Sequence, residues 1–174
     1  RLFPVFFRFS RFLQYLTNVI QNNNFNGIIN GENWLREKFL TCSVYVDIGY
    51  NKGEWSQYIA NKNKSSKIYA FDPCNDVVKK FQSEKVKFPN IKLEQLALSN
   101  KDGLIDFYDY GEMNGCNSLS KRDMDFPDSI NPSIYQVSVT SLDKWALKNN
   151  LEHIDFLKID AEGEDLNILE GASL

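Results

Sequence analysis

The stretch Val44-Tyr-Val-Asp-Ile-Gly-Tyr-Asn-Lys-Gly53 decides the fold of this chain of 174 residues. It opens with a short apolar run, which is typical of a strand buried inside a parallel sheet. Gly49 and Gly53 then predict a tight turn, because glycine adopts backbone conformations that other residues avoid. Residues 54–61 are a candidate helix. A strand, a glycine turn and a helix in this order predict the beginning of a β-α-β unit.

The same alternation continues toward the C-terminus. Further strands are expected at residues 67–71, 91–98 and 155–159, and helices at 76–86, at 143–150 and from 165 onward. We therefore predict an α/β fold with a Rossmann-like, doubly wound, mainly parallel sheet and helices on both faces. The strands near residues 44, 68, 91 and 155 should have the order 3-2-1-4 in that sheet.

Two more strands are expected at residues 104–108 and 135–140. They should form an added hairpin or lengthen one edge of the sheet. The polar segment between them is long for a structureless connection, so it is a candidate substrate loop.

The N-terminal part has a different character. Helices are expected at residues 6–21 and 32–40, which makes residues 1–43 an N-terminal helical extension and residues 44–174 the main domain. Residues 1–12 mix aromatic and basic side chains, so a membrane-surface segment is the alternative to a helix that packs its aromatic face on the domain. We favour the packed helix. A full domain of this class continues with further strands beyond residue 174, so we expect C-terminal strands to be missing.

The composition excludes several classes of protein. The net charge is −3, so no overall basic field would recruit nucleic acid. The three cysteines fit neither a zinc pattern nor a disulfide framework, which favours a reducing, cytoplasmic location. No apolar run is long enough to span a bilayer.

An acidic residue follows the second predicted strand. Asp72 ends Tyr69-Ala-Phe-Asp72, and a carboxylate at that point can accept both hydroxyls of a ribose. The alternative is that Asp72 is the N-cap of the next helix. Its position beside the glycine turn favours the ribose role. The chain has neither the G-x-G-x-x-G fingerprint of dinucleotide enzymes nor a P-loop, which argues against those two classes.

Six blocks of this sequence, in order, resemble the FkbM-type S-adenosylmethionine-dependent methyltransferases of the class I, Rossmann-like group. They are Val46-Asp-Ile-Gly-Tyr-Asn-Lys-Gly53, Ala70-Phe-Asp-Pro73, Leu96-Ala-Leu-Ser-Asn-Lys-Asp-Gly103, Asn117-Ser-Leu119, Val139-Thr-Ser-Leu-Asp143 and Asp155-Phe-Leu-Lys-Ile-Asp-Ala-Glu-Gly163. The resemblance implies an enzyme that methylates a hydroxyl group. The acceptor would be a sugar on a glycan or glycolipid, or a small natural product.

The resemblance also implies a set of cofactor contacts. The methionine end of S-adenosylmethionine would lie against the glycine turn, the ribose on Asp72 and the adenine beside the third strand. The implied residues are Asp47, Gly49, Asn51, Gly53, Asp72, Pro73, Gln95, Leu96 and Ala97. Asn117 and Ser118 would approach the substrate. Two positions depart from the family: it usually has Glu at position 72, and it often has Ala where this chain has Tyr50. That ring either points away from the ligand or narrows the pocket.

Methyl transfer to a hydroxyl group also needs a proton acceptor. Asp160 is the first candidate, because it ends a central strand beside the glycine turn, and Glu162 could share the role. The alternatives are that Asp160 orients the cofactor and that Glu162 caps the next helix. Lys158 lies inside the strand, so we expect it to pair with a carboxylate such as Asp47 or Glu162.

Two kinds of site are not expected in this chain. His153 precedes its strand at the opposite edge from the site, so we expect a surface residue and no histidine base. Carboxylates at Asp160, Glu162 and Asp165 could hold magnesium, but nothing fixes a ligand geometry, and we predict no metal site. The competing hypothesis is a non-catalytic binding module on the same fold.

Overall fold

The computed structural model describes residues 31–111, 115–121 and 131–173. The chain divides into two compact units, residues 1–40 and 41–174. In the first unit the described residues hold helix α2 (Glu32–Lys38), which confirms the helix predicted at residues 32–40. The helix predicted at residues 6–21 and the aromatic, basic segment lie outside the described residues. The domain boundary after residue 43 stays a prediction.

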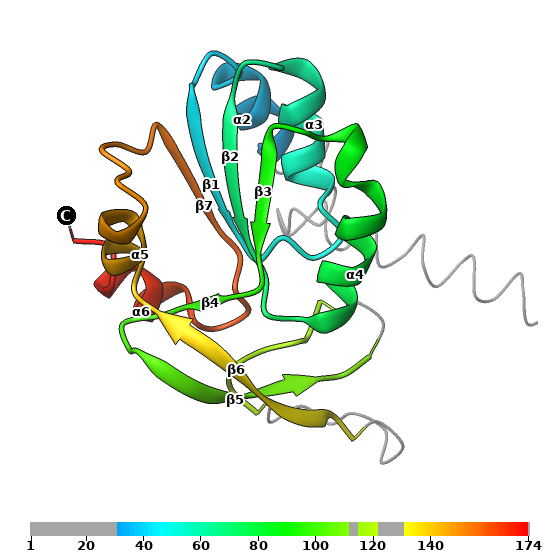
Figure 1. The fold of residues 1–174 in the computed structure, drawn as a ribbon, viewed down its shortest axis with the longest axis vertical. Coiled ribbons are helices and arrows are strands. Elements are labelled where there is room, and N and C mark those ends of the chain that lie inside the picture. The colour runs from blue at the N-terminus through cyan, green and yellow to red at the C-terminus, as the bar shows by residue number, and fades with distance from the viewer. Residues whose placement is uncertain (1–30, 112–114, 122–130, 174) are drawn as a thin grey trace, which may run out of the picture. The chain divides into compact units, whose positions relative to one another are not determined.

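The second unit is built on a four-stranded parallel sheet (Figure 1). Its strands are β1 (Val44–Ile48), β2 (Lys67–Phe71), β3 (Ile91–Glu94) and β7 (Phe156–Ile159). They have the order β3-β2-β1-β7, which confirms the predicted order. Every residue of β1 is buried, as expected for a central strand covered on both faces. Ile48 pairs with both Phe71 and Ile159, so these three strands end together at one edge.

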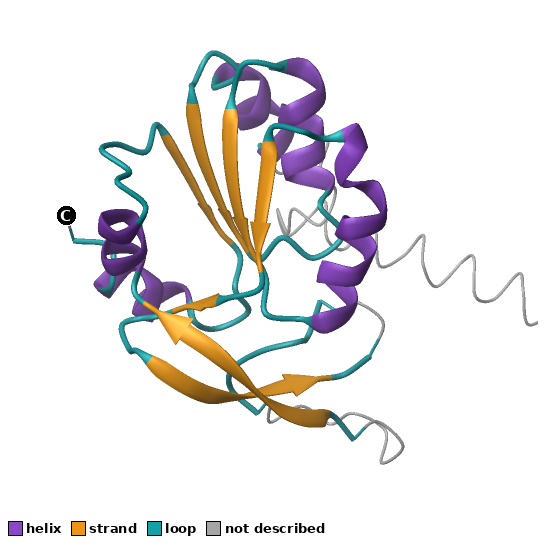
Figure 2. Ribbon diagram, viewed as in Figure 1, coloured by secondary structure: helices purple, strands orange, loops and turns teal. Residues whose placement is uncertain are grey.

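Helices cover both faces of this sheet, as predicted (Figure 2). Helices α3 (Glu54–Lys62) and α4 (Asn75–Glu84) lie on one side, and α5 (Leu142–Lys148) and α6 (Asp165–Glu170) on the other. Side chains alternate between the faces of a strand, and each face has its own aromatic contacts. Tyr45 meets Trp55 of α3 with ring centroids 6.0 Å apart, and Phe71 meets Trp145 of α5 at 4.8 Å.

A second sheet lies beyond the end of the first, and here the predicted strand at residues 91–98 is wrong in extent. β3 stops at Glu94, and β4 (Ala97–Leu98) pairs with β6 (Ser133–Thr140) instead. The chain turns between the two strands, where the Leu96 amide donates to the Glu94 carbonyl at 3.0 Å. β5 (Gly103–Asp109) completes the order β4-β6-β5. The two strands expected near residues 104 and 136 therefore form an added antiparallel pair and do not lengthen the parallel sheet.

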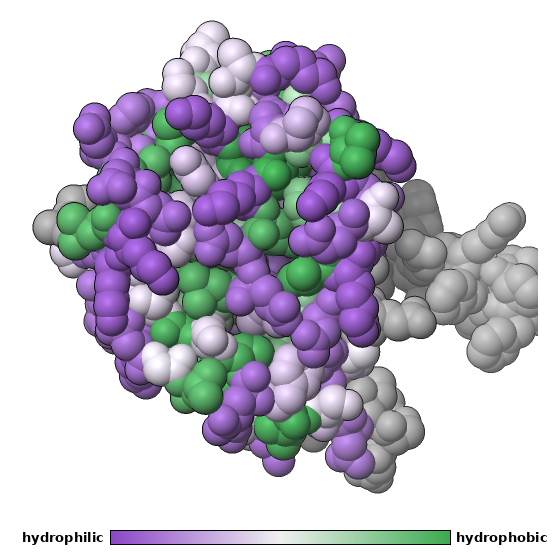
Figure 3. All heavy atoms as spheres, in the orientation of Figure 1, coloured by the Kyte–Doolittle hydropathy of each residue, from purple (hydrophilic) through white to green (hydrophobic). Residues whose placement is uncertain are grey.

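Polar side chains cover most of the face shown in Figure 3, with small apolar patches between them. Scattered apolar residues of this kind are normal on a folded domain. No helix among the described residues is long and apolar enough to cross a membrane.

The glycine turn between β1 and α3 is fixed by close contacts within the protein. Gly49 has a φ of 82°, and a Cβ built there would lie 2.0 Å from the Asp160 carbonyl oxygen. At Gly53, with a φ of 77°, a Cβ would lie 2.3 Å from the hydroxyl of Tyr50. Glycine is needed at both positions because this chain's own atoms occupy the space of a side chain.

We predict that Gly49→Ala destabilises the domain by about 3 kcal/mol or more, since it combines backbone strain with a backbone collision. Gly111→Ala is the matched control, because Gly111 also has a positive φ but nothing lies within 4 Å of a Cβ built at that position. That control should cost only about 1–2 kcal/mol. Guanidinium unfolding monitored by circular dichroism measures both changes. Equal losses in the two variants would contradict the role of the close contact.

Candidate functional site

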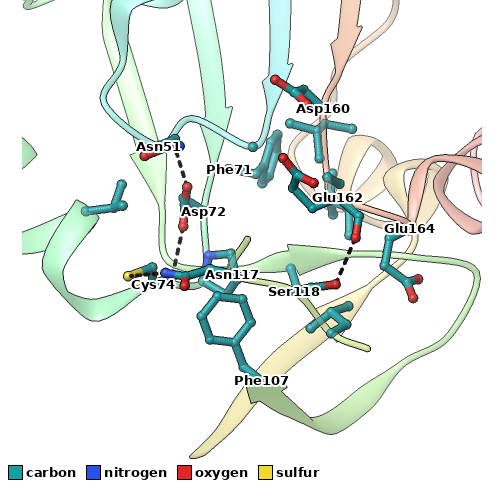
Figure 4. Close-up of a pocket in the computed structure, with 18 of the residues that line it drawn as sticks. Asn51, Phe71, Asp72, Cys74, Phe107, Asn117, Ser118, Asp160, Glu162 and Glu164 are labelled. Atoms are coloured by element: carbon teal, nitrogen blue, oxygen red, sulfur yellow. Dashed lines mark hydrogen bonds between the residues drawn. The ribbon is translucent and has the colours of Figure 1, made fainter. Parts of the chain in front are cut away.

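A cavity of about 680 Å³, part of it open to solvent, lies at the carboxyl edge of β1 and β2 (Figure 4). Residues from both sheets line it. Its larger apolar side chains are Ile48, Phe71, Val77, Leu96, Leu98, Phe107 and Leu119. The carboxyl edge of a parallel sheet is the usual place for a ligand in this type of fold.

Most of the residues proposed from the sequence line this cavity. They are Gly49, Asn51, Asp72, Pro73, Leu96, Ala97, Asn117, Ser118, Asp160 and Glu162. Asp47, Gly53 and Gln95 do not belong to the lining. The structure thus brings the glycine turn, the residue after β2 and the residues after β7 to one hollow, while the binding role of each residue stays a prediction.

Asp72 connects the glycine turn to the start of α4. One carboxylate oxygen accepts from the amide of Asn51 at 2.8 Å, and the other accepts from the amide of Cys74 at 2.9 Å. The N-cap position of α4 belongs to Cys74, so the alternative that Asp72 is the N-cap is wrong. Burial raises the pKa of Asp72 to about 6, although these two amides act in the opposite direction. Because a carboxylate oxygen has two lone pairs, each oxygen of Asp72 has the capacity to accept a second hydrogen bond.

Asp47 is fully buried beneath α3. Its carboxylate accepts from the hydroxyl of Ser56 at 2.6 Å and from the ammonium of Lys158 at 3.0 Å. The ion pair predicted between Lys158 and Asp47 is therefore confirmed. Burial raises the pKa of Asp47, and the ammonium and the hydroxyl oppose that effect. The Asp47 carboxylate therefore binds other side chains of the protein and does not line the cavity.

The turn after β7 carries two carboxylates with different surroundings. The Asp160 carboxylate is largely exposed and lies 3.7 Å from the ammonium of Lys158. Glu162 has a φ of 52°, a backbone conformation that is uncommon outside glycine and is often found at functional sites. Its carboxylate lies beside the loop, because a Cβ built on Gly115 would lie 3.9 Å from Glu162 Oε1.

Helix α6 does not use Glu162 as its cap. The N-cap position belongs to Glu164, and the Asp165 carboxylate accepts from the amides of Ala161 and Gly163, each at 3.3 Å. The alternative that Glu162 caps this helix is therefore wrong. Among the described residues, no group of three His, Cys, Asp or Glu side chains is arranged to hold a metal ion.

Tyr50 points away from the cavity, which decides between the two alternatives for its ring. It is 5% exposed, and its ring meets Phe81 edge-on with centroids 5.6 Å apart. Its hydroxyl accepts from the side-chain amide of Gln57 at 3.1 Å. The bulky residue at this position fills space between the turn and the helices.

A family model described as the methyltransferase FkbM domain matches residues 47–174. The chain belongs to this family. Its α/β architecture agrees with that assignment, and the resemblance inferred from the six blocks is confirmed.

Relatives of this FkbM domain carry methyltransferase names. Methyltransferase 1 of Beauveria bassiana is 28% identical over 144 residues, which cover 74% of this chain and 58% of that protein. The 2-O-methyltransferase NoeI of Sinorhizobium fredii is 24% identical over 142 residues, covering 74% and 56%. Methyltransferase sdnD of Sordaria araneosa is 26% identical over 159 residues, covering 72% and 59%. The chain thus spans less than two thirds of the length of these relatives. No solved structure matches it.

Two side chains of this FkbM domain that were proposed to meet substrate are already engaged. Asn117 accepts from the amide of Tyr110 at 2.8 Å and donates to the Asp109 carboxylate at 3.1 Å. Ser118 donates to the carbonyl of Glu162 at 2.9 Å. These contacts attach the loop to β5 and to the turn after β7, so both residues form part of the cavity's frame.

Glu164 and Cys74 also line the cavity, although the sequence did not single them out. Glu164 is 7% exposed, and its carboxylate accepts from Ser99 and Asn167, each at 3.0 Å. The acidic run of residues 160–165 was the available signal, but it did not show which carboxylate turns inward. The described residues that line the cavity include acidic side chains but no Lys, Arg or His.

We predict that Asn117→Ala destabilises the FkbM domain by about 2 kcal/mol, because it leaves the Tyr110 amide and one Asp109 oxygen without this partner. Thermal unfolding monitored by circular dichroism measures the change. Asn61→Ala is the control, since it removes only an exposed contact with Lys64 and should stay within about 0.5 kcal/mol of the wild type. An unchanged stability in Asn117→Ala would show that this amide does not hold the loop.

Proposed function

We propose that this FkbM domain binds S-adenosylmethionine in the cavity and catalyses transfer of its methyl group to a hydroxyl group of a sugar. The acceptor would be a glycan, a glycolipid or a small natural product. The supporting observation is that one cavity joins the glycine turn and Asp72 to the carboxylates of Asp160 and Glu162. Family membership supports methyl transfer, and the name of the 2-O-methyltransferase relative favours a hydroxyl acceptor.

The residues present suit this cofactor. The side-chain oxygen of Asn51 is buried and has no hydrogen-bond partner among the described residues, so it could accept from an ammonium or hydroxyl group. Asp72 could accept from ribose hydroxyls with its remaining lone pairs, and Leu96 and Ala97 offer an apolar surface to an adenine ring. A wall whose charged groups are carboxylates favours a sulfonium cation and disfavours the pyrophosphate of a dinucleotide.

The cofactor would supply a methyl group bonded to a sulfonium sulfur, which is already a good leaving group. The protein therefore mainly has to align the two reactants. As the oxygen–carbon bond forms and the carbon–sulfur bond breaks, the acceptor hydroxyl must lose its proton. We assign that proton to Glu162, because this residue lines the cavity and its carboxylate lies beside the loop. Asp160 lies beside Lys158 and is better placed to orient the ligand at the rim.

Calorimetry with S-adenosylmethionine and with NAD tests the proposal. Binding of S-adenosylmethionine without binding of NAD is the expected result. Binding of NAD alone would overturn the assignment. If S-adenosylmethionine binds but no compound in a panel of glycans and small hydroxylated molecules accepts its labelled methyl group, the result favours the alternative of a non-catalytic binding module.

We predict that Asp72→Ala weakens S-adenosylmethionine binding by about tenfold or more, corresponding to about 1.4 kcal/mol, because a buried acceptor for the ribose is lost. Asp160→Ala should weaken binding less, since its carboxylate is largely exposed. Asp76→Ala, which removes an exposed pair with Lys79, is the control and should bind normally. Calorimetry gives all three affinities, and the reverse ranking of the first two variants would show that their roles are exchanged.

The pKa of Asp72, about 6, predicts a pH dependence of binding. Ribose hydroxyls donate to the ionised carboxylate, so binding favours loss of the proton. The dissociation constant should be constant above this pKa and rise by up to about tenfold per pH unit below it. Calorimetry between about pH 5 and pH 8 measures the slope, and Asp72→Asn should remove it. Equal affinity at both ends of this range in the wild type would argue against a role for the ionised form.

A further inference from the structure

A lysine with a mostly buried side chain lies on β7, which is the edge strand of the described parallel sheet and not the central strand expected from the sequence. The side chain of Lys158 is 20% exposed, and that of its partner Asp47 is 1% exposed. Ser56, on the helix that covers this face, donates to the second oxygen of Asp47 at 2.6 Å. Both oxygens of Asp47 are therefore held, one by the ammonium and one by the hydroxyl.

A buried ion pair is a weak source of stability. The loss of hydration on burial opposes the attraction between the charges, and apolar side chains of similar volume often stabilise a fold equally well. The position of Lys158 therefore calls for another explanation, which its remaining contacts provide.

The ammonium of Lys158 makes two contacts toward the cavity. It donates to the carbonyl of Gly49 at 3.3 Å, and it lies 3.7 Å from the carboxylate of Asp160. Gly49 and Asp160 both line the cavity. One cation thus connects the end of β1, the glycine turn and the end of β7.

We infer that Lys158 is a positioning residue for methyl transfer, which holds the Gly49 carbonyl and the Asp160 carboxylate in place while Asp47 and Ser56 hold its ammonium from behind. This inference rests on the proposed function. It gives Asp47 a role through Lys158, without direct contact to the cofactor. Asp47 is absent from the cavity lining, in agreement with this role.

Variants that remove one charge of the Lys158–Asp47 pair, and a variant that removes both, distinguish a positioning role from a purely structural one. Lys158→Met and Asp47→Asn alone each leave a buried charge without its partner and should lower Tm. The double variant Asp47→Asn/Lys158→Met removes both charges and should recover much of that Tm. Its affinity for S-adenosylmethionine should nevertheless stay about tenfold or more below that of the wild type. Lys92→Met is the matched control, because Lys92 pairs with Glu94 at 2.8 Å on the exposed side of β3; it should change neither quantity.

Calorimetry and thermal unfolding of these variants decide the inference. A double variant that recovers both Tm and affinity would overturn it, because the pair would then be only structural. If the double variant does not fold, Lys158→Arg is the deciding variant: it keeps the charge but not the geometry of the three contacts. Weakened binding with a nearly unchanged Tm supports the inference, and wild-type affinity in that variant overturns it. Failure of the wild type itself to bind S-adenosylmethionine would instead refute the proposed function.

Discussion

The close approach of Gly49 to the backbone of Asp160 is the constraint on which the site depends. A side chain at Gly49 would overlap the carbonyl of Asp160, so the two strand ends meet at a separation that leaves no room for a Cβ. β1 and β7 are hydrogen-bonded neighbours, and their ends therefore reach the edge of the sheet together. As a result, the glycine turn and the turn after β7 form adjoining parts of one wall of the cavity.

The second sheet supplies the rest of that wall, and hydrogen bonds of Asp109 and Ser118 hold it in place. The Asp109 carboxylate accepts from Tyr135 at 3.1 Å and from Asn117 at 3.1 Å, while Ser118 reaches across to the carbonyl of Glu162. These bonds link β5, β6, the loop and the turn after β7. The cavity is thus formed between elements that are distant in sequence, and these polar contacts connect the elements around it.

Much of the fold could be predicted because its signals are local. The run Val44–Ile48, the glycines after it and the alternation of strands and helices predicted the parallel sheet and its order. The strand expected at residues 91–98 was wrong in extent because the local pattern of apolar and polar residues does not reveal that the chain turns near Gln95 and continues in another sheet. Pairing partners decide such a change, and they lie more than forty residues away, on β6.

The site was predictable in outline, but the direction of individual side chains was not. Residues at strand ends were placed together because parallel strands share an edge. Asp47 was expected to face a ligand, yet Ser56, nine residues later, covers it, and only the packing of α3 could show this. The side chain of Asn117 was expected to meet substrate, whereas its amide is bonded to Tyr110 and Asp109. Such contacts depend on the three-dimensional arrangement and leave no periodic pattern in the sequence.

The carboxylate-lined wall has a consequence for the order of events under the proposed function. The cofactor enters with a net positive charge, and loss of its methyl group turns the sulfonium into a neutral thioether. The same wall that attracts the fresh donor then attracts the spent molecule less, because one favourable charge interaction is gone. Electrostatics alone would give each catalytic cycle an inherent bias toward exchange of the used cofactor for a new one.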